Sequence, residues 1–171
     1  MHISMYEASV PVFQRALTNL AAILAKGAAH AEAKKFDPAI LVNARLAPDM
    51  LPLSRQIQIA TDHARGAAAR LAGLERPPMP DNETSFDDLQ KRIALTLDYL
   101  ATFKPAQIDG SEDREITVPQ RSGELKLRGM PYLLHFAHPN FWFHVTTAYA
   151  ILRHHGVEIG KLDFLGAPPT A

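Results

Sequence analysis

Four stretches of this chain repeat apolar residues at steps of three and four, and this spacing constrains the fold more than any other feature. Each such stretch forms a helix with one apolar stripe, and the stripe must be buried against a neighbouring element. The stretches cover residues 4–35, 48–71, 84–104 and 130–155. Four stripes of this kind predict an all-α fold, in which four helices pack into a bundle.

Proline, glycine and capping residues set the expected ends of these helices. Pro11 marks either a kink in the first helix or its true start, because proline cannot donate a backbone hydrogen bond. Gly73 ends the second helix, and the hydroxyl of Thr84 or Ser85 caps the third. Asp37 and Pro38 predict an additional short helix that ends near residue 43.

A change of period separates the third and fourth helices. Residues 115–118 (EITV) and 124–127 (ELKL) alternate polar and apolar side chains, which is typical of strands. The intervening residues 119–123 (PQRSG) form a turn sequence. A small β-hairpin is therefore expected between these helices.

The composition narrows the class of protein. A length of 171 residues suits one domain over 1–171, and 18 basic side chains balance 18 acidic ones without a basic cluster. Nucleic acid is therefore not an expected partner. The chain has no cysteine, so metal ligands must come from His, Asp, Glu or Asn. No apolar run reaches the roughly 18 to 20 residues that span a bilayer, so we expect a soluble cytoplasmic protein with no membrane partner.

The run from Met130 to Gly160 holds five of the eight histidines and the single tryptophan. Pro139 interrupts it and is expected to bend the helix. Because proline cannot donate a hydrogen bond, the backbone carbonyl of His135 loses its usual partner, so His135 and His138 both belong to this bend. On a straight helix neither of these two histidines shares a face with His144. At the end of the run, His154 and His155 suit the negative end of the helix.

Asn140 and His144 do share a face, because they are four residues apart. On the second helix, His63 lies at the edge of the apolar stripe, beside Gln56 and Ile59. His63 is either a half-buried histidine that is hydrogen-bonded to a neighbour or a ligand that faces a cleft between helices.

Several segments resemble an uncharacterised bacterial family of the DinB/YfiT-like superfamily. They are MYEASVPVF, ARLAPDM, QIATDHARGAAARLAG, QIDGSEDREI and YLLHFAHPNFWFHVTTAYAILRHHGVEIGKLDFLG. The resemblance implies an up-and-down four-helix bundle that is often dimeric. It also implies a divalent metal, held in better-studied relatives by one histidine on the second helix and a His-x-x-x-His pair on a late helix. Some of those relatives are thiol-dependent transferases or isomerases.

Transferred to this chain, the resemblance gives a metal site of His63, Asn140 and His144. Asn140 stands where the relatives have a histidine, and an amide oxygen is a weaker ligand than imidazole for zinc or nickel. The expected cofactor is therefore a divalent metal (zinc, nickel or manganese) or none. His138 replaces Asn140 only if the bend at Pro139 is sharp.

Two hypotheses follow for function. In the first, the chain is a homodimeric module that binds a small ligand or is structural, and Phe141, Trp142 and Phe143 pack both core and interface. In the second, the chain is a metal-dependent enzyme of the thiol-dependent type with a degenerate histidine site, and its pocket is lined by residues such as Tyr132, Trp142 and Tyr149. The absence of a third strong ligand favours the first hypothesis slightly.

Overall fold

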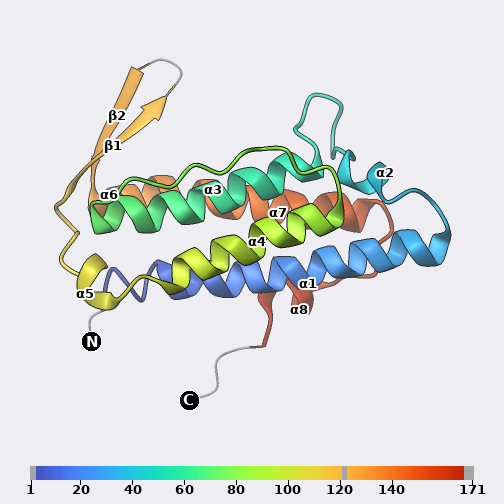
Figure 1. Cartoon of the computed structure of the whole chain (residues 1–171), viewed down its shortest axis with the longest axis horizontal. Coiled ribbons are helices and arrows are strands. Elements are labelled where there is room, and N and C mark those ends of the chain that lie inside the picture. Colours follow the sequence, from blue (N-terminus) through green and yellow to red (C-terminus); the bar gives the residue numbers. More distant parts are fainter. Residues whose placement is uncertain (1–2, 121–122, 168–171) are drawn as a thin grey trace.

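Four long helices lie side by side in the computed structural model, which describes residues 3–120 and 123–167 (Figure 1). They are α1 (Val10–Lys34), α3 (Leu53–Ala72), α4 (Phe86–Ala101) and α7 (His138–His154). Shorter helices lie in the connections and near the C-terminus: α2 (Ala39–Val42), α5 (Pro105–Ile108), α6 (Gly129–Tyr132) and α8 (Lys161–Leu165). The mostly helical class is confirmed, although the described residues contain more helices than the four long ones.

The helices do not alternate in direction throughout, which corrects the expected up-and-down order. Arg92 of α4 contacts Thr61 of α3, and one to two turns later Tyr99 stacks beside Arg65. Residue numbers therefore rise in the same direction along the two helices, so α3 and α4 are parallel. Figure 1 shows the reason, because residues 74–85 run back along the whole of α3 before α4 begins.

Side chains of α3 and α4 hold this returning segment in place. Arg65 donates to the carbonyl of Pro77, and Arg55 pairs with Asp81 at 2.6 Å. Ser85, one of the two expected capping residues, then starts α4 with a capping box, while Gly73 ends α3 in the left-handed conformation at φ 73°. The segment 74–85 thus covers one side of α3 (Figure 1).

The expected hairpin is present between α5 and α6. Strands β1 (Glu115–Gln120) and β2 (Gly123–Arg128) pair antiparallel, with Ile116 opposite Leu127. Ile116 and Val118 are buried in the core, while Thr117 between them is exposed. Residues 121 and 122 of the predicted turn lie outside the described residues.

The expected helix over 130–155 is not continuous α-helix. Residues Leu133–Ala137 form a π-helical segment, here labelled η1, and α7 follows with Pro139 in its first turn. A π-helix inserts one extra residue into a turn, which lets the chain accommodate a proline that cannot donate a hydrogen bond. The predicted irregularity at Pro139 is therefore a widened turn.

Prolines also decide two helix starts. Pro11 lies in the first turn of α1, so it marks the true start rather than a kink. The second long helix begins at Leu53 and not at residue 48, because Pro52 disfavours helical geometry in the residue before it. Within the described part of the chain, no helix is long and apolar enough to cross a membrane.

Candidate functional site

The rings of His63 and His144 face each other across the contact between α3 and α7. Their centroids are 6.0 Å apart and their planes differ by 15°. Both histidines lie near the widened η1 turn, since Phe136 packs 5.8 Å from the ring of His63. The structure thus brings together two of the three site residues expected from the sequence.

The side chain of Asn140 is hydrogen-bonded to the backbone. Its amide nitrogen donates to the backbone carbonyl of Phe136 at 2.7 Å. This carbonyl belongs to the π-helical segment, where the regular hydrogen-bond ladder is disturbed. The side chain of Asn140 therefore adds a hydrogen bond to the backbone of the η1 segment.

Gln56, one of the residues beside His63 on α3, fixes the protonation of His144. The amide nitrogen of Gln56 donates to the carbonyl of Leu51, so its Oε1 is free to accept. Nδ1 of His144 lies 2.7 Å from this oxygen and must carry the proton, because an amide oxygen cannot donate. Nε2 of His144 is then the nitrogen with a free lone pair.

Burial keeps both imidazoles neutral. The pKa of His63 is lowered from 6.5 to about 4, mainly by burial and in addition by the neighbouring His144, Arg70 and Arg76, whereas Asp62 opposes them. Burial alone lowers the pKa of His144 from 6.5 to about 4. At neutral pH the pair therefore offers nitrogen lone pairs rather than positive charge.

The other histidines of the C-terminal run do not join this pair. Nε2 of His138 lies 2.8 Å from the carbonyl of Ala8, on the side of α7 that packs against Phe13. His135 is exposed, and His155 is hydrogen-bonded to the carbonyl of Ile151 at the end of α7. His138 is thus not a substitute for Asn140.

The aromatic residues of α6 and α7 separate into different environments. Trp142 and Tyr149 pack against Phe164 of α8, away from the histidine pair, so they do not line its pocket. Tyr132 is fully buried, and its hydroxyl accepts a hydrogen bond from Arg70. Of the expected core and interface run, Phe141 is buried whereas Phe143 is 57% exposed.

His63 also lines an open cavity of about 240 Å³. Its walls come from α3, the segment 74–85, β1 and η1: Arg55, Ile59, Asp62, His63, Arg70, Arg76, Asp81, Val118, Pro119 and Phe136. Small-molecule sites combine an apolar wall with a few converging polar groups, and this cavity has both. A larger hollow of about 590 Å³ between α1 and α4 has acidic and amide side chains at its wall but no histidine or arginine.

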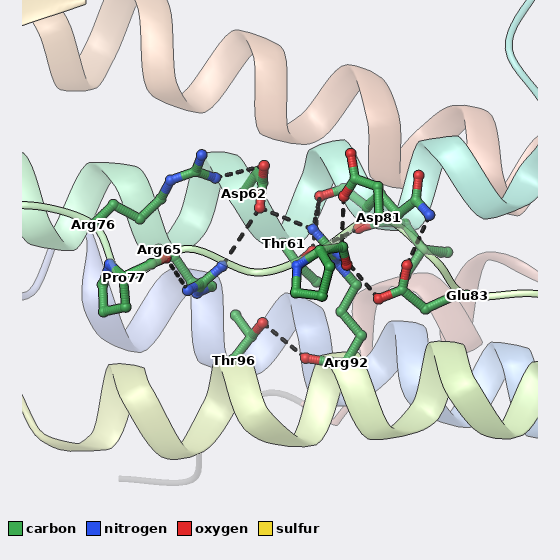
Figure 2. Close-up of polar contacts among 12 residues, drawn as sticks. Thr61, Asp62, Arg65, Arg76, Pro77, Asp81, Glu83, Arg92 and Thr96 are labelled. Atoms are coloured by element: carbon green, nitrogen blue, oxygen red, sulfur yellow. Dashed lines mark hydrogen bonds and ion pairs between the residues drawn. The ribbon is translucent and has the colours of Figure 1, made fainter.

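A buried network of ion pairs supports one side of the cavity (Figure 2). Arg92, which is 1% exposed, pairs with Asp62, Asp81 and Glu83 at 2.9 to 3.0 Å. Its Nε also donates to the hydroxyl of Thr61. The apolar stripe of α4 gave no sign of this network, although Arg92 occupies a stripe position three residues after Leu89.

The histidine pair fits a metal only in part. A catalytic zinc site commonly uses three protein ligands, and this pair supplies two imidazoles, of which His144 has the suitable free Nε2. Within residues 3–120 and 123–167, no group of three His, Cys, Asp or Glu side chains could hold an ion. Asn140 would have to provide its oxygen while its nitrogen stays on Phe136.

The chain is similar to known proteins over nearly its whole length. The model of a family described as a domain of unknown function (DUF1993) matches residues 5–165. A crystal structure of a DinB family member protein from Shewanella denitrificans is 43% identical, with a TM-score of 0.89. The match covers 97% of this chain and 94% of that one. No curated protein matches. These results confirm the resemblance to a DinB-like family of unknown function that the sequence indicates.

Proposed function

The chain belongs to the DUF1993 family, and we propose that it is a small-molecule-binding protein of the DinB-like four-helix-bundle type, whose ligand contacts His63 in the cavity beside α3. The observation that carries this proposal is the pair of neutral, half-buried histidines, of which His63 lines the wall of a polar cavity. Two imidazoles with depressed pKa values are costly for a purely structural core, because acidification turns both into buried charges.

The environment of His63 supports ligand binding over a purely structural role. Neither of its ring nitrogens is hydrogen-bonded to another residue that the structure describes, whereas His144 is held by Gln56. The ring nitrogens of His63 are also not among the buried side-chain atoms that lack a partner, so they reach the open cavity. His63 therefore has hydrogen-bonding capacity to offer to a molecule in the cavity.

The test is binding of a small-molecule fragment library, followed by nuclear magnetic resonance of the histidine side chains. We expect fragments that bind to shift the ring resonances of His63, and we expect His63→Ala to abolish their binding. His155→Ala, at the exposed end of α7, is the matched control. A library in which no fragment shifts His63, or binding that survives His63→Ala unchanged, contradicts the proposal.

A second candidate function is a metal-dependent enzyme, and the free Nε2 of His144 favours it. His63, His144 and the oxygen of Asn140 would be the protein ligands for zinc, nickel or manganese. The expected result is a rise in melting temperature on adding one of these ions to untagged protein, lost in His144→Ala. Equal melting temperatures with and without each ion would exclude this candidate.

We also propose that the chain forms a homodimer. Phe143 is 57% exposed and Leu134 is 48% exposed, on the segment that otherwise supplies the core. Exposed aromatic side chains of this size are enriched at interfaces between subunits. Light scattering should give the mass of two chains for the wild type and of one chain for Phe143→Ser. A monomeric wild type would contradict the proposal.

A further inference from the structure

The cavity beside His63 has an excess of positive charge. Its walls and the supporting network contain five arginines and three carboxylates: Arg55, Arg65, Arg70, Arg76 and Arg92 against Asp62, Asp81 and Glu83. The two aspartates that line the cavity are each shared between arginines, since Asp62 pairs with Arg76 and Arg92, among others. Their negative charge is therefore compensated within the protein.

Arg70 differs from the other four arginines. No carboxylate that the structure describes pairs with it, and its hydrogen bond is a long one, 3.3 Å, to the hydroxyl of Tyr132. Its guanidinium also lies 6.0 Å from the centre of the Tyr132 ring, so that an aromatic face orients it. An arginine that is oriented but lacks an anionic partner at a cavity wall is suited to pair with an anion from outside.

A glycine makes room for this arrangement. Gly66 lies one turn before Arg70 in the interior of α3, where glycine is unfavourable for a helix. A Cβ on Gly66 would come within 2.5 Å of Nη1 of Arg70. The absent side chain thus allows the guanidinium to lie against the helix, at the wall of the cavity.

We propose that this cavity binds a small organic oxyanion, a carboxylate or a phosphate ester, with Arg70 as its charge partner. His63 and Phe136 would contact the body of the ligand from one side, and Val118 and Pro119 of β1 would contact it from the other. This inference rests on the proposed ligand-binding function and specifies its ligand class. A volume of about 240 Å³ limits the ligand to the size of a small metabolite.

Four compounds that share a phenyl ring test the effect of charge: anionic benzoate and phenyl phosphate, neutral benzamide and cationic benzylamine. We expect benzoate or phenyl phosphate to shift the ring resonances of His63 in the full-length protein, with affinity that falls as salt is raised. The stronger of these two anions identifies the head group. We expect benzamide and benzylamine to bind at least about tenfold more weakly, because they lack the charge-assisted pair with Arg70.

Two variants test the role of Arg70. Arg70→Gln should weaken binding of the preferred anion by about tenfold or more, while Arg153→Gln, on the exposed end of α7, should leave it unchanged. Gly66→Ala should weaken binding as well, because the new methyl group displaces the guanidinium. The same substitution should leave the melting temperature unchanged or raise it, since alanine favours helix. A loss of affinity without a loss of stability cannot come from misfolding.

Three results would overturn the inference. They are benzamide binding as tightly as benzoate, anion affinity unchanged in Arg70→Gln, and no response of His63 to either anion. If fragments without charge still bind at His63, the proposed ligand-binding function stands and only the ligand class is wrong. If no fragment of any charge binds there, the proposed function itself fails.

Discussion

The neutral pair of His63 and His144 should make the stability of the protein fall steeply in mild acid. For both groups the folded-state pKa is depressed from 6.5 to about 4. Between these values the unfolded chain takes up protons while the folded protein does not. The contribution of the pair to stability is therefore complete above pH 6.5 and is lost as pH falls toward 4.

The size of the effect follows from the pKa values. One pKa unit corresponds to about 1.4 kcal/mol, so each histidine lowers the free energy of unfolding by up to about 2 kcal/mol between about pH 8 and pH 5. The two together give at most about 4 kcal/mol, a large part of the ~5 to 15 kcal/mol that a domain commonly has. Solvent in the open cavity reduces this figure, because both rings are only half-buried.

Urea unfolding followed by circular dichroism, repeated across this pH range, measures the effect. The control is the double variant His63→Gln/His144→Gln, whose stability should depend much less on pH. His63→Gln alone should remove about half of the dependence. Asp88 and Asp163 have carboxyl groups of lowered pKa and also lose stabilising interactions on acidification. They do so at lower pH than the range in which the unfolded histidines take up protons.

The reasoning would be refuted if the double variant kept the full pH dependence of the wild type. A magnetic resonance titration provides a second check, because the ring signals of His63 and His144 should remain those of neutral imidazole down to about pH 5. If either ring titrates near 6.5 in the folded protein, burial does not act as described. The pKa of His63 also depends on charges that face it from α3 and the segment 74–85, namely Arg70, Asp62 and Arg76, whereas burial alone lowers the pKa of His144.

Three further substitutions test the supports of the site. Arg92→Met should lower the free energy of unfolding by about 3 to 5 kcal/mol, because buried Glu83 loses its cation; urea unfolding measures this, and a loss under 1 kcal/mol would contradict a central role. Gln56→Leu should cost about 1 to 3 kcal/mol in the same assay, since Nδ1 of His144 loses its acceptor. Asn140→Ala should cost about 1 kcal/mol in this assay, because the carbonyl of Phe136 loses the amide that donates to it.

The helical parts of the fold follow from local sequence. The apolar stripes, the capping box at Ser85, the left-handed Gly73 and the alternating strands each depend on residues a few positions apart, and the structure confirms all of them. The direction of α4 could not be predicted in this way. It depends on where residues 74–85 run, and contacts such as Arg55 with Asp81 join residues that are distant in the chain.

The candidate site was predictable in part for the same reason. Helical geometry selects His63 as a boundary residue and separates His144 from His135 and His138. It cannot show that residues 133–137 form a π-helical turn or that the carbonyl of Phe136 accepts from Asn140, because the widened turn changes the register of the helix. The i, i+4 spacing of Asn140 and His144 therefore does not reveal that the amide nitrogen of Asn140 donates to the backbone.

The residue at position 140 affects both the backbone of the widened turn and the affinity of the site for a metal. A histidine at position 140 would place a third imidazole near His63 and His144 but would lack the amide that donates to Phe136. Asn140 meets the widened turn with its amide nitrogen, and its oxygen is a weaker metal ligand than an imidazole nitrogen. Asn140→His should consequently raise affinity for zinc or nickel, because imidazole is a stronger ligand than an amide oxygen, and lower stability without metal. If metal affinity stays at the wild-type level, the rings of His63 and His144 are not arranged to share an ion, and the cavity with Arg70 remains the functional part of the site.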